Sequence, residues 1–261
     1  MDFPGHGRSQ HMSKDAWYSI LEYPEYVVEA ARSLGWDKFS LVGHSMGGAV
    51  ASLVAASFPD MVERCVFLDI LGPFTLSPGT SPKGLRASIA SRRKLLSKEP
   101  KPYASFEEAV RTRLKSVTMW GAEGQTLSRA GAVRLVAGGT EPWEDKGQVK
   151  FTNDVRLRAS SSSYLTEESV LTYLRAIESD CLLIRGETGM LANADESPKF
   201  VARKEAFGQE GRLRELVLPG SHHLHLDDDT APLVASHTAD FLHGRGRDHA
   251  EGDSRRTPSR L

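Results

Sequence analysis

The chain has 261 residues, of which 39% are hydrophobic and 26% are charged, and its formal net charge is −1. This length and composition are typical of one globular α/β domain with a large core. A charge so close to zero argues against a nucleic-acid-binding protein, and because no run of eighteen apolar residues occurs, no membrane span is expected.

The first strongly patterned segment is a short β-prone run, Lys38–Val42, which leads into Gly43-His44-Ser45-Met46-Gly47 and then into a small, apolar, helix-compatible stretch at 48–58. Strand, Gly-x-Ser-x-Gly and helix in this order are typical of a nucleophile elbow. We expect the glycines on either side of the serine to remove Cβ atoms that would collide in the strained turn. The pattern therefore predicts Ser45 as a nucleophile and the Met46 N–H as an oxyanion donor.

A second strand, Arg64–Leu68, follows and ends at Asp69. Beyond residue 72 the pattern changes from strands to amphipathic helices, and it stays helical as far as about residue 180. The four predicted helices cover Pro82–Leu96, Ser105–Val117, Thr126–Val136 and Thr166–Ile177.

Two more strands, Cys181–Arg185 and Arg214–Leu218, and a final helix, Thr230–Leu242, complete the predicted domain. The two cysteines, Cys65 and Cys181, fall within predicted strands and are expected to be buried and reduced.

Several histidines follow the last strand, and a serine nucleophile needs a histidine base. We favour His222, since His223 is expected to point away from it and His225 to pack near the final helix. A metal site is the alternative, because Asp227, Asp228 and Asp229 come next. No second cluster of ligands accompanies them, so neither a metal nor another cofactor is expected.

The tail at 244–261 is charged and almost free of large apolar residues, so we expect it to be disordered. It ends in Ser259-Arg260-Leu261, which is similar to the peroxisomal address Ser-Lys-Leu. A peroxisomal import receptor is therefore a possible partner, and both a peroxisomal and a cytoplasmic location stay open.

These motifs together resemble the α/β-hydrolase superfamily and, more narrowly, its serine hydrolase-like proteins. The resemblance is carried by the elbow and by DFPGHGRS at 2–9, GGT at 138–140, FTNDVRLR at 151–158 and PGSH at 219–222. It implies an α/β fold with a mostly parallel sheet, in which residues 1–72 and 181–243 form the core and 73–180 a helical cap. It also implies hydrolysis of an ester, thioester or similar small acyl substrate through an acyl-enzyme.

The resemblance extends to the base and the pocket. In this group a small residue precedes the catalytic histidine, as Ser221 precedes His222 here. Four aromatic residues of the expected cap could line an acyl pocket, but core packing is the favoured role for most of them. They are Tyr103, Trp120, Trp143 and Tyr164.

The acid of the expected catalytic triad is the least certain member. In many α/β-hydrolases it lies in a turn after the penultimate strand, but here that turn reads Gly186-Glu187-Thr188-Gly189, with glycine in place of aspartate. The other known position is the end of the strand that follows the nucleophile helix, which favours Asp69. Glu187 and Asp195 are the reserves, and hydrogen bonding within a loop is an alternative role for Asp69.

The chain departs from the family pattern at its N-terminus. Family members carry three strands and a His-Gly loop before DFPGHG, whereas Met1 directly precedes Asp2 here. We therefore expect the first strands and one oxyanion donor to be missing and Lys38–Val42 to form an exposed sheet edge. The alternative function is a catalytically impaired truncated isoform or a non-catalytic binding protein.

Overall fold

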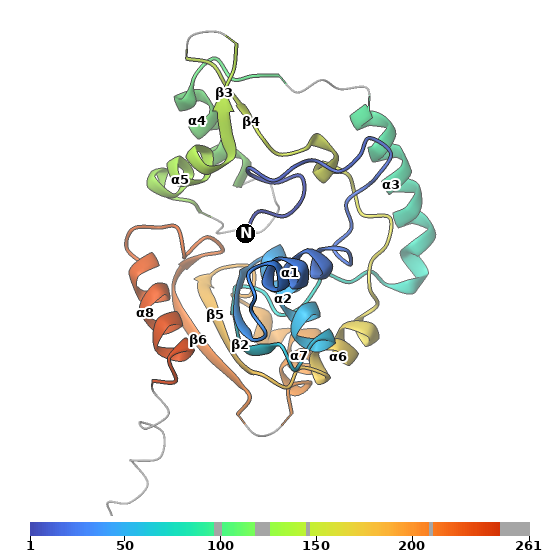
Figure 1. The fold of residues 1–261 in the computed structure, drawn as a ribbon, viewed down its shortest axis with the longest axis vertical. Helices are drawn as coiled ribbons and strands as arrows, with labels where there is room; N and C mark the ends of the chain where they lie inside the picture. The colour runs from blue at the N-terminus through green and yellow to red at the C-terminus, as the bar shows by residue number, and fades with distance from the viewer. Residues whose placement is uncertain (97–100, 118–125, 145–146, 209–210, 246–261) are drawn as a thin grey trace, which may run out of the picture.

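The computed structural model describes residues 1–96, 101–117, 126–144, 147–208 and 211–245 (Figure 1). Its centre is a parallel four-stranded sheet with the order β1-β2-β5-β6. The α/β class and the mostly parallel sheet are confirmed. The four strands agree with the expected ones and are somewhat longer: β1 is Phe39–His44, β2 Val62–Leu68, β5 Asp180–Thr188 and β6 Leu213–Ser221.

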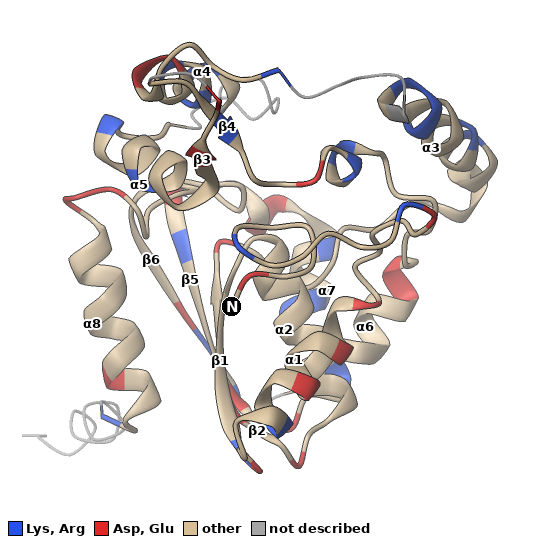
Figure 2. Cartoon of the chain, turned by 45° about the horizontal axis from the view of Figure 1, so that its top comes forward, with Lys and Arg blue, Asp and Glu red and all other residues tan. Residues whose placement is uncertain are grey.

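Helices cover both faces of this sheet (Figures 1 and 2). One face carries α8, and the other carries the group α1, α2, α6 and α7. Their bounds are Ala231–Leu242 for α8, Tyr23–Ser33 for α1, Met46–Ser57 for α2, Glu167–Arg175 for α6 and Pro198–Glu205 for α7. The sequence analysis predicted α2, α6 and α8 but not α1 and α7.

Residues of β2 alternate between the two cores that these helices complete. Cys65 and Phe67 pack into the cluster under α1, α2 and α6, while Val66 and Leu68 pack into the cluster under α8. Burial on both faces explains why the strands of a parallel sheet read as continuous apolar runs. Cys65 and Cys181 are fully buried, unpaired and adjacent in register, as expected for small core residues.

The segment between β2 and β5 holds the predicted helices. They are α3 at Ser81–Leu96, α4 at Phe106–Val117, α5 at Arg129–Gly139 and α6. The segment also holds a hairpin that the sequence analysis missed, formed by β3 (Thr140–Pro142) and β4 (Val149–Phe151). The described residues also form short 3₁₀ helices at Pro78–Thr80, Val155–Arg158 and Ala194–Glu196.

Helices α4 and α5 share a small apolar core of their own. Ala109 and Val110 of α4 and Ala132 and Val136 of α5 are fully buried against each other. This unit lies over the sheet edge at which the strands end, because residues of both helices line the same pocket as the ends of β1 and β6.

The N-terminal segment is tied to the stretch that follows β4. Arg156 donates hydrogen bonds to the carbonyl oxygens of Met12, Ser13 and Ala16, and the Tyr18 hydroxyl donates to the Asp154 carboxylate at 2.8 Å. Residues that carried the family resemblance thus hold two chain segments together that are about 140 positions apart.

Strand β1 lies at the edge of the sheet, as expected, with β2 as its sole strand neighbour in the described ranges. Val42 on this strand is 50% exposed. Within the same ranges, no helix has both the length and the apolar character needed to cross a bilayer. Trp120 and residues 246–261, including Ser259-Arg260-Leu261, lie outside the described residues.

Candidate active site

Ser45 occupies a strained turn between β1 and α2. Its φ is 50° and its ψ is −121°, a backbone conformation that residues other than glycine rarely adopt. A Cβ at Gly43 would overlap the backbone of Gly47 and Gly48, which explains the glycine there. The expectation for Gly47 was wrong, because a Cβ at that position meets open space; the second close approach involves Gly48, which packs against Ile70.

Asp69 directly follows β2 and is the only other non-glycine residue with positive φ in the described part of the chain, at 52°. Its side chain is completely buried. The carboxylate accepts hydrogen bonds from the backbone N–H of Met190 at 2.6 Å and of Gly186 at 3.3 Å. The hydrogen bonds from these two N–H groups compensate for the burial of the carboxylate.

His222 lies just past the end of β6 and is buried beside Asp69. Its Nδ1–H donates to Asp69 Oδ2 at 2.7 Å, because a carboxylate can only accept. This contact joins residues 153 positions apart in the chain. The structure therefore brings together the predicted base and the favoured acid.

The two reserve acids lie elsewhere. Asp195 forms ion pairs with Arg185 at 2.6 Å and with Lys204 at 2.7 Å. Glu187 is exposed near the carboxyl end of β5. In the described part of the chain, neither of them lines the pocket that contains Ser45.

Gly189 explains why the turn after β5 carries no acid. A Cβ on Gly189 would overlap both carboxylate oxygens of Asp69. The absent side chain leaves the space that the Asp69 carboxylate fills, so an aspartate at the usual position and Asp69 in its present conformation exclude each other.

His44, which precedes the serine in the elbow, supports the loop that carries His222. Its Nε2–H donates to the carbonyl oxygen of His222 at 2.7 Å. Burial lowers the pKa of His44 to about 2, with a further contribution from the neighbouring histidines. His44 therefore stays neutral and can hold this backbone position at any ordinary pH.

His44, His222, His223 and His225 form one cluster of histidines, with His44 in contact with the other three. Ring centroids lie 4.1 Å apart for His44 and His225 and 5.4 Å apart for His44 and His223. Burial lowers the pKa of both His223 and His225 to about 4. In the described residues no group of three or more His, Cys, Asp or Glu side chains has a geometry that could hold a metal ion.

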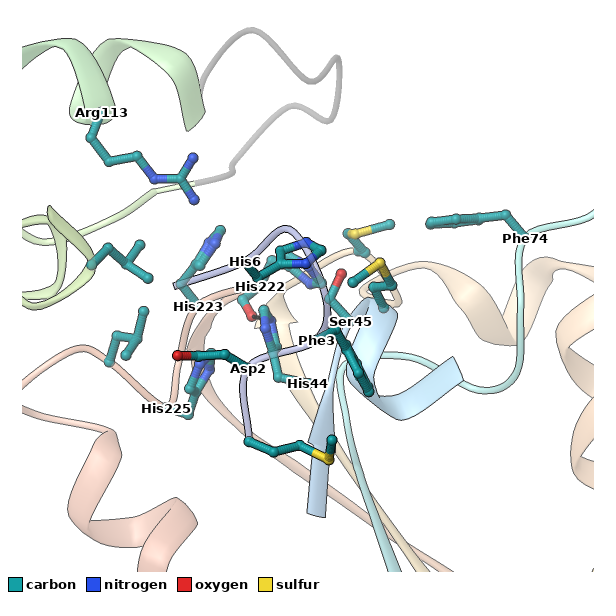
Figure 3. Close-up of a pocket in the computed structure, with 16 residues that line it drawn as sticks. Asp2, Phe3, His6, His44, Ser45, Phe74, Arg113, His222, His223 and His225 are labelled. Carbon is teal, nitrogen blue, oxygen red and sulfur yellow. Dashed lines mark hydrogen bonds between the residues drawn. The ribbon is translucent and has the colours of Figure 1, made fainter. Parts of the chain in front are cut away.

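A pocket of about 610 Å³ opens over Ser45 (Figure 3). Half of its sixteen lining residues are apolar, five are histidines, and one is an arginine, Arg113, from α4. The lining residues are Met1, Asp2, Phe3, His6, His44, Ser45, Met46, Gly47, Phe74, Arg113, Leu135, Met190, His222, His223, His225 and Leu226.

The three expected aromatic residues that the structure describes do not line the pocket, and core packing, the favoured role for most of them, holds for Tyr103. Tyr103 packs edge-on against Phe151, Lys150 covers the ring of Trp143, and Tyr164 is outside the pocket lining. Phe3 and Phe74 line the pocket instead. The order of residues in the chain did not indicate which aromatic side chains face the serine, because this depends on how the α4–α5 unit lies on the sheet.

Met46 begins α2 beside the pocket. Its backbone N–H belongs to the first turn, where the helix itself offers no acceptor, and the helix dipole favours negative charge there. The N–H is therefore available to a ligand oxygen. The sequence analysis selected this residue, but it overlooked His44, Met190 and Arg113; a histidine next to the elbow serine was the one signal that could have pointed to the first.

Comparison with known proteins agrees with this geometry. The family model for the alpha/beta hydrolase fold matches residues 1–229. A serine hydrolase-like protein of Dictyostelium discoideum is 32% identical over 88% of this chain and 63% of its own length, and a probable serine hydrolase of Drosophila melanogaster is 30% identical over 93% and 71%. The crystal structure of a hypothetical protein from Pseudomonas aeruginosa PAO1 superposes with a TM-score of 0.81 at 35% identity, covering 93% of this chain and 80% of that one. The chain therefore belongs to the α/β-hydrolase family and to its serine hydrolase-like proteins.

Proposed function

We propose that this protein hydrolyses an ester, thioester or similar small acyl substrate through an acyl-enzyme. Ser45 is the nucleophile, His222 the general base and Asp69 the acid that orients it. The observation that carries the proposal is the 2.7 Å hydrogen bond from His222 Nδ1–H to Asp69 at the pocket that contains Ser45. A carboxylate in this position holds the imidazole tautomer and stabilises its protonated form.

The first half of the reaction forms the acyl-enzyme. Ser45 Oγ attacks the carbonyl carbon of the substrate while His222 Nε2 takes the hydroxyl proton. The carbonyl oxygen becomes an oxyanion, which the Met46 N–H at the start of α2 stabilises. When the tetrahedral intermediate collapses, the bond to the alcohol or thiol breaks and His222 returns the proton to this leaving group.

The second half repeats these steps with water. His222 takes a proton from a water molecule, whose oxygen attacks the acyl carbon, and the Ser45 ester bond then breaks as Ser45 regains its proton. The product is the free acid. A pocket of about 610 Å³, half of whose lining residues are apolar, supports a small acyl substrate.

Labelling by a fluorophosphonate probe tests the nucleophile. The 261-residue chain should be labelled, and Ser45→Ala should abolish labelling, because the probe reacts with an activated serine. Ser57→Ala is the matched control, since Ser57 is exposed at the other end of the same helix. Labelling that survives Ser45→Ala would disprove the assignment, and a folded wild-type chain that is not labelled would favour a non-catalytic binding protein.

We also propose that Ser259-Arg260-Leu261 directs the protein to peroxisomes. The polar, charged composition of residues 244–261 is suited to presenting a C-terminal tripeptide to an import receptor. A fluorescent protein that carries residues 244–261 should accumulate in peroxisomes, and deletion of Leu261 should leave it in the cytosol. A diffuse signal from both fusions would contradict the proposal.

A further inference from the structure

Arg113 is a cation on the inward face of α4. Ala109 and Val110 of the same helix are fully buried, and Arg113 follows them by four and three positions, so the three share one helical face. Arg111 and Lys115 are exposed. The guanidinium group extends from α4 into the pocket toward His223 (Figure 3).

No carboxylate pairs with Arg113 in the described part of the chain. The acids on the neighbouring elements have other partners: Glu107 pairs with Arg129, Asp228 pairs with Arg134, and Asp227 accepts a hydrogen bond from the Ser128 N–H. Asp2, the one acid among the described residues that line the pocket, accepts from the Arg8 backbone N–H at 3.0 Å. Burial lowers the pKa of Arg113.

Partial burial of an arginine without a counterion costs free energy unless a ligand supplies the opposite, negative charge. Burial lowers the pKa of His223 and His225 to about 4, so both rings are neutral at ordinary pH and do not compete for an anion. The remaining walls near Arg113, Leu135 and Leu226, are apolar. Among the described side chains that line the pocket, Arg113 thus carries the fixed positive charge.

We infer that the acyl substrate carries a carboxylate at the end remote from the scissile carbonyl, and that Arg113 binds this carboxylate while Ser45 attacks. The inference rests on the proposed function, since it names the substrate class of the same site. A guanidinium group and a carboxylate can form two parallel hydrogen bonds, which supplies orientation as well as affinity. Arg113 lies at one end of the pocket, with Ser45 between it and Phe74 (Figure 3).

The first test compares two esters that differ only at the remote end of the acyl chain: mono-p-nitrophenyl glutarate, which ends in a carboxylate, and p-nitrophenyl valerate, which ends in a methyl group. Arg113→Gln should lower the ratio of kcat/KM for glutarate over valerate by about ten- to hundredfold, the usual range for one ionic hydrogen-bonded contact. Arg113→Lys should retain part of the ratio, because it keeps the charge. Arg111→Gln, an exposed arginine of the same helix, should not change it.

The second test does not depend on catalysis, so it separates failure of this inference from failure of the proposed function. Calorimetry measures binding of monomethyl glutarate to Ser45→Ala and to the Ser45→Ala/Arg113→Gln double variant. The second substitution should weaken binding at least about tenfold. Equal affinities, absence of binding to Ser45→Ala, or a glutarate-to-valerate ratio that Arg113→Gln leaves unchanged would each overturn the inference.

Discussion

The turns after β2 and β5 lie side by side at the same edge of the sheet, yet one contributes an acid to the candidate site and the other contributes the donors and the space that receive it. The β2 turn provides a buried carboxylate, Asp69, on strained backbone. The end of β5 and the turn after it, together called the β5 turn here, provide two N–H donors, from Gly186 and Met190, and an empty space at Gly189. The acid and the space for it are therefore complementary, and a carboxylate from either strand would need the same volume beside His222.

The strongest test of this difference removes the charge from the β2 turn. Asp69→Asn should lower kcat/KM by about a thousand- to ten-thousandfold, because the amide neither fixes the His222 tautomer nor stabilises its protonated form. Hydrolysis of p-nitrophenyl esters measures the loss. Glu187→Gln on the β5 turn is the control and should change the rate less than about twofold, since Glu187 is exposed. The reverse order of effects would move the acid to the β5 turn.

A smaller loss should follow when the empty space is filled. Gly189→Ala places a methyl group where the Asp69 carboxylate lies, so the carboxylate must shift away from His222. A displacement of about 1 Å near the reacting groups can cost about a hundredfold in rate. Gly138→Ala is the matched control, because a Cβ there meets nothing within 4 Å. Equal kcat/KM for Gly189→Ala and wild type would show that the two positions do not compete for one volume.

Exchanging the residues at positions 69 and 189 tests directly whether the two turns are equivalent. Asp69→Gly alone should be nearly inactive, while Asp69→Gly/Gly189→Asp moves the carboxylate to the β5 turn and leaves glycine at the position with positive φ. We expect the double variant to recover at least about tenfold over Asp69→Gly in kcat/KM, the scale of one oriented ionic contact. If the double variant is no more active than the single one, the two turns are not equivalent supports for an acid.

Acid should destabilise the fold through the buried histidines beside these turns. Burial lowers the pKa of His223 and His225 from 6.5 to about 4, so between these values the unfolded chain binds more protons than the folded one. Their contribution to stability is complete above pH 6.5 and is lost as the pH falls toward 4. Urea unfolding at pH 7.5, 5.5 and 4.5 measures this change.

The control for this prediction is His225→Gln, which removes one of the two titrating groups. Its free energy of unfolding should depend less steeply on pH between 6.5 and 4 than that of the wild type. An identical slope in both proteins would show that His225 takes up no extra proton on unfolding.

Much of the architecture could be predicted from the sequence because the signals are local. Strands buried on both faces appear as short apolar runs, and the predicted runs correspond to β1, β2, β5 and β6. The helices α1 and α7 were missed, and the hairpin β3–β4 has strands of only three residues, too short for a periodic pattern. The aromatic residues that line the pocket, Phe3 and Phe74, were not identified from the sequence, because the lining depends on how distant segments pack.

The sequence by itself determined the elbow around Ser45, since a strand, a Gly-x-Ser-x-Gly turn and a helix are set by neighbouring residues. It also narrowed the base to three histidines and the acid to Asp69, Glu187 and Asp195. Only the tertiary structure decided which of these meet, because the contact between Asp69 and His222 spans 153 positions and requires β2, β5 and β6 to end at one edge of the sheet. The inward position of Arg113 was likewise decided by packing, since charge alone predicts an exposed side chain.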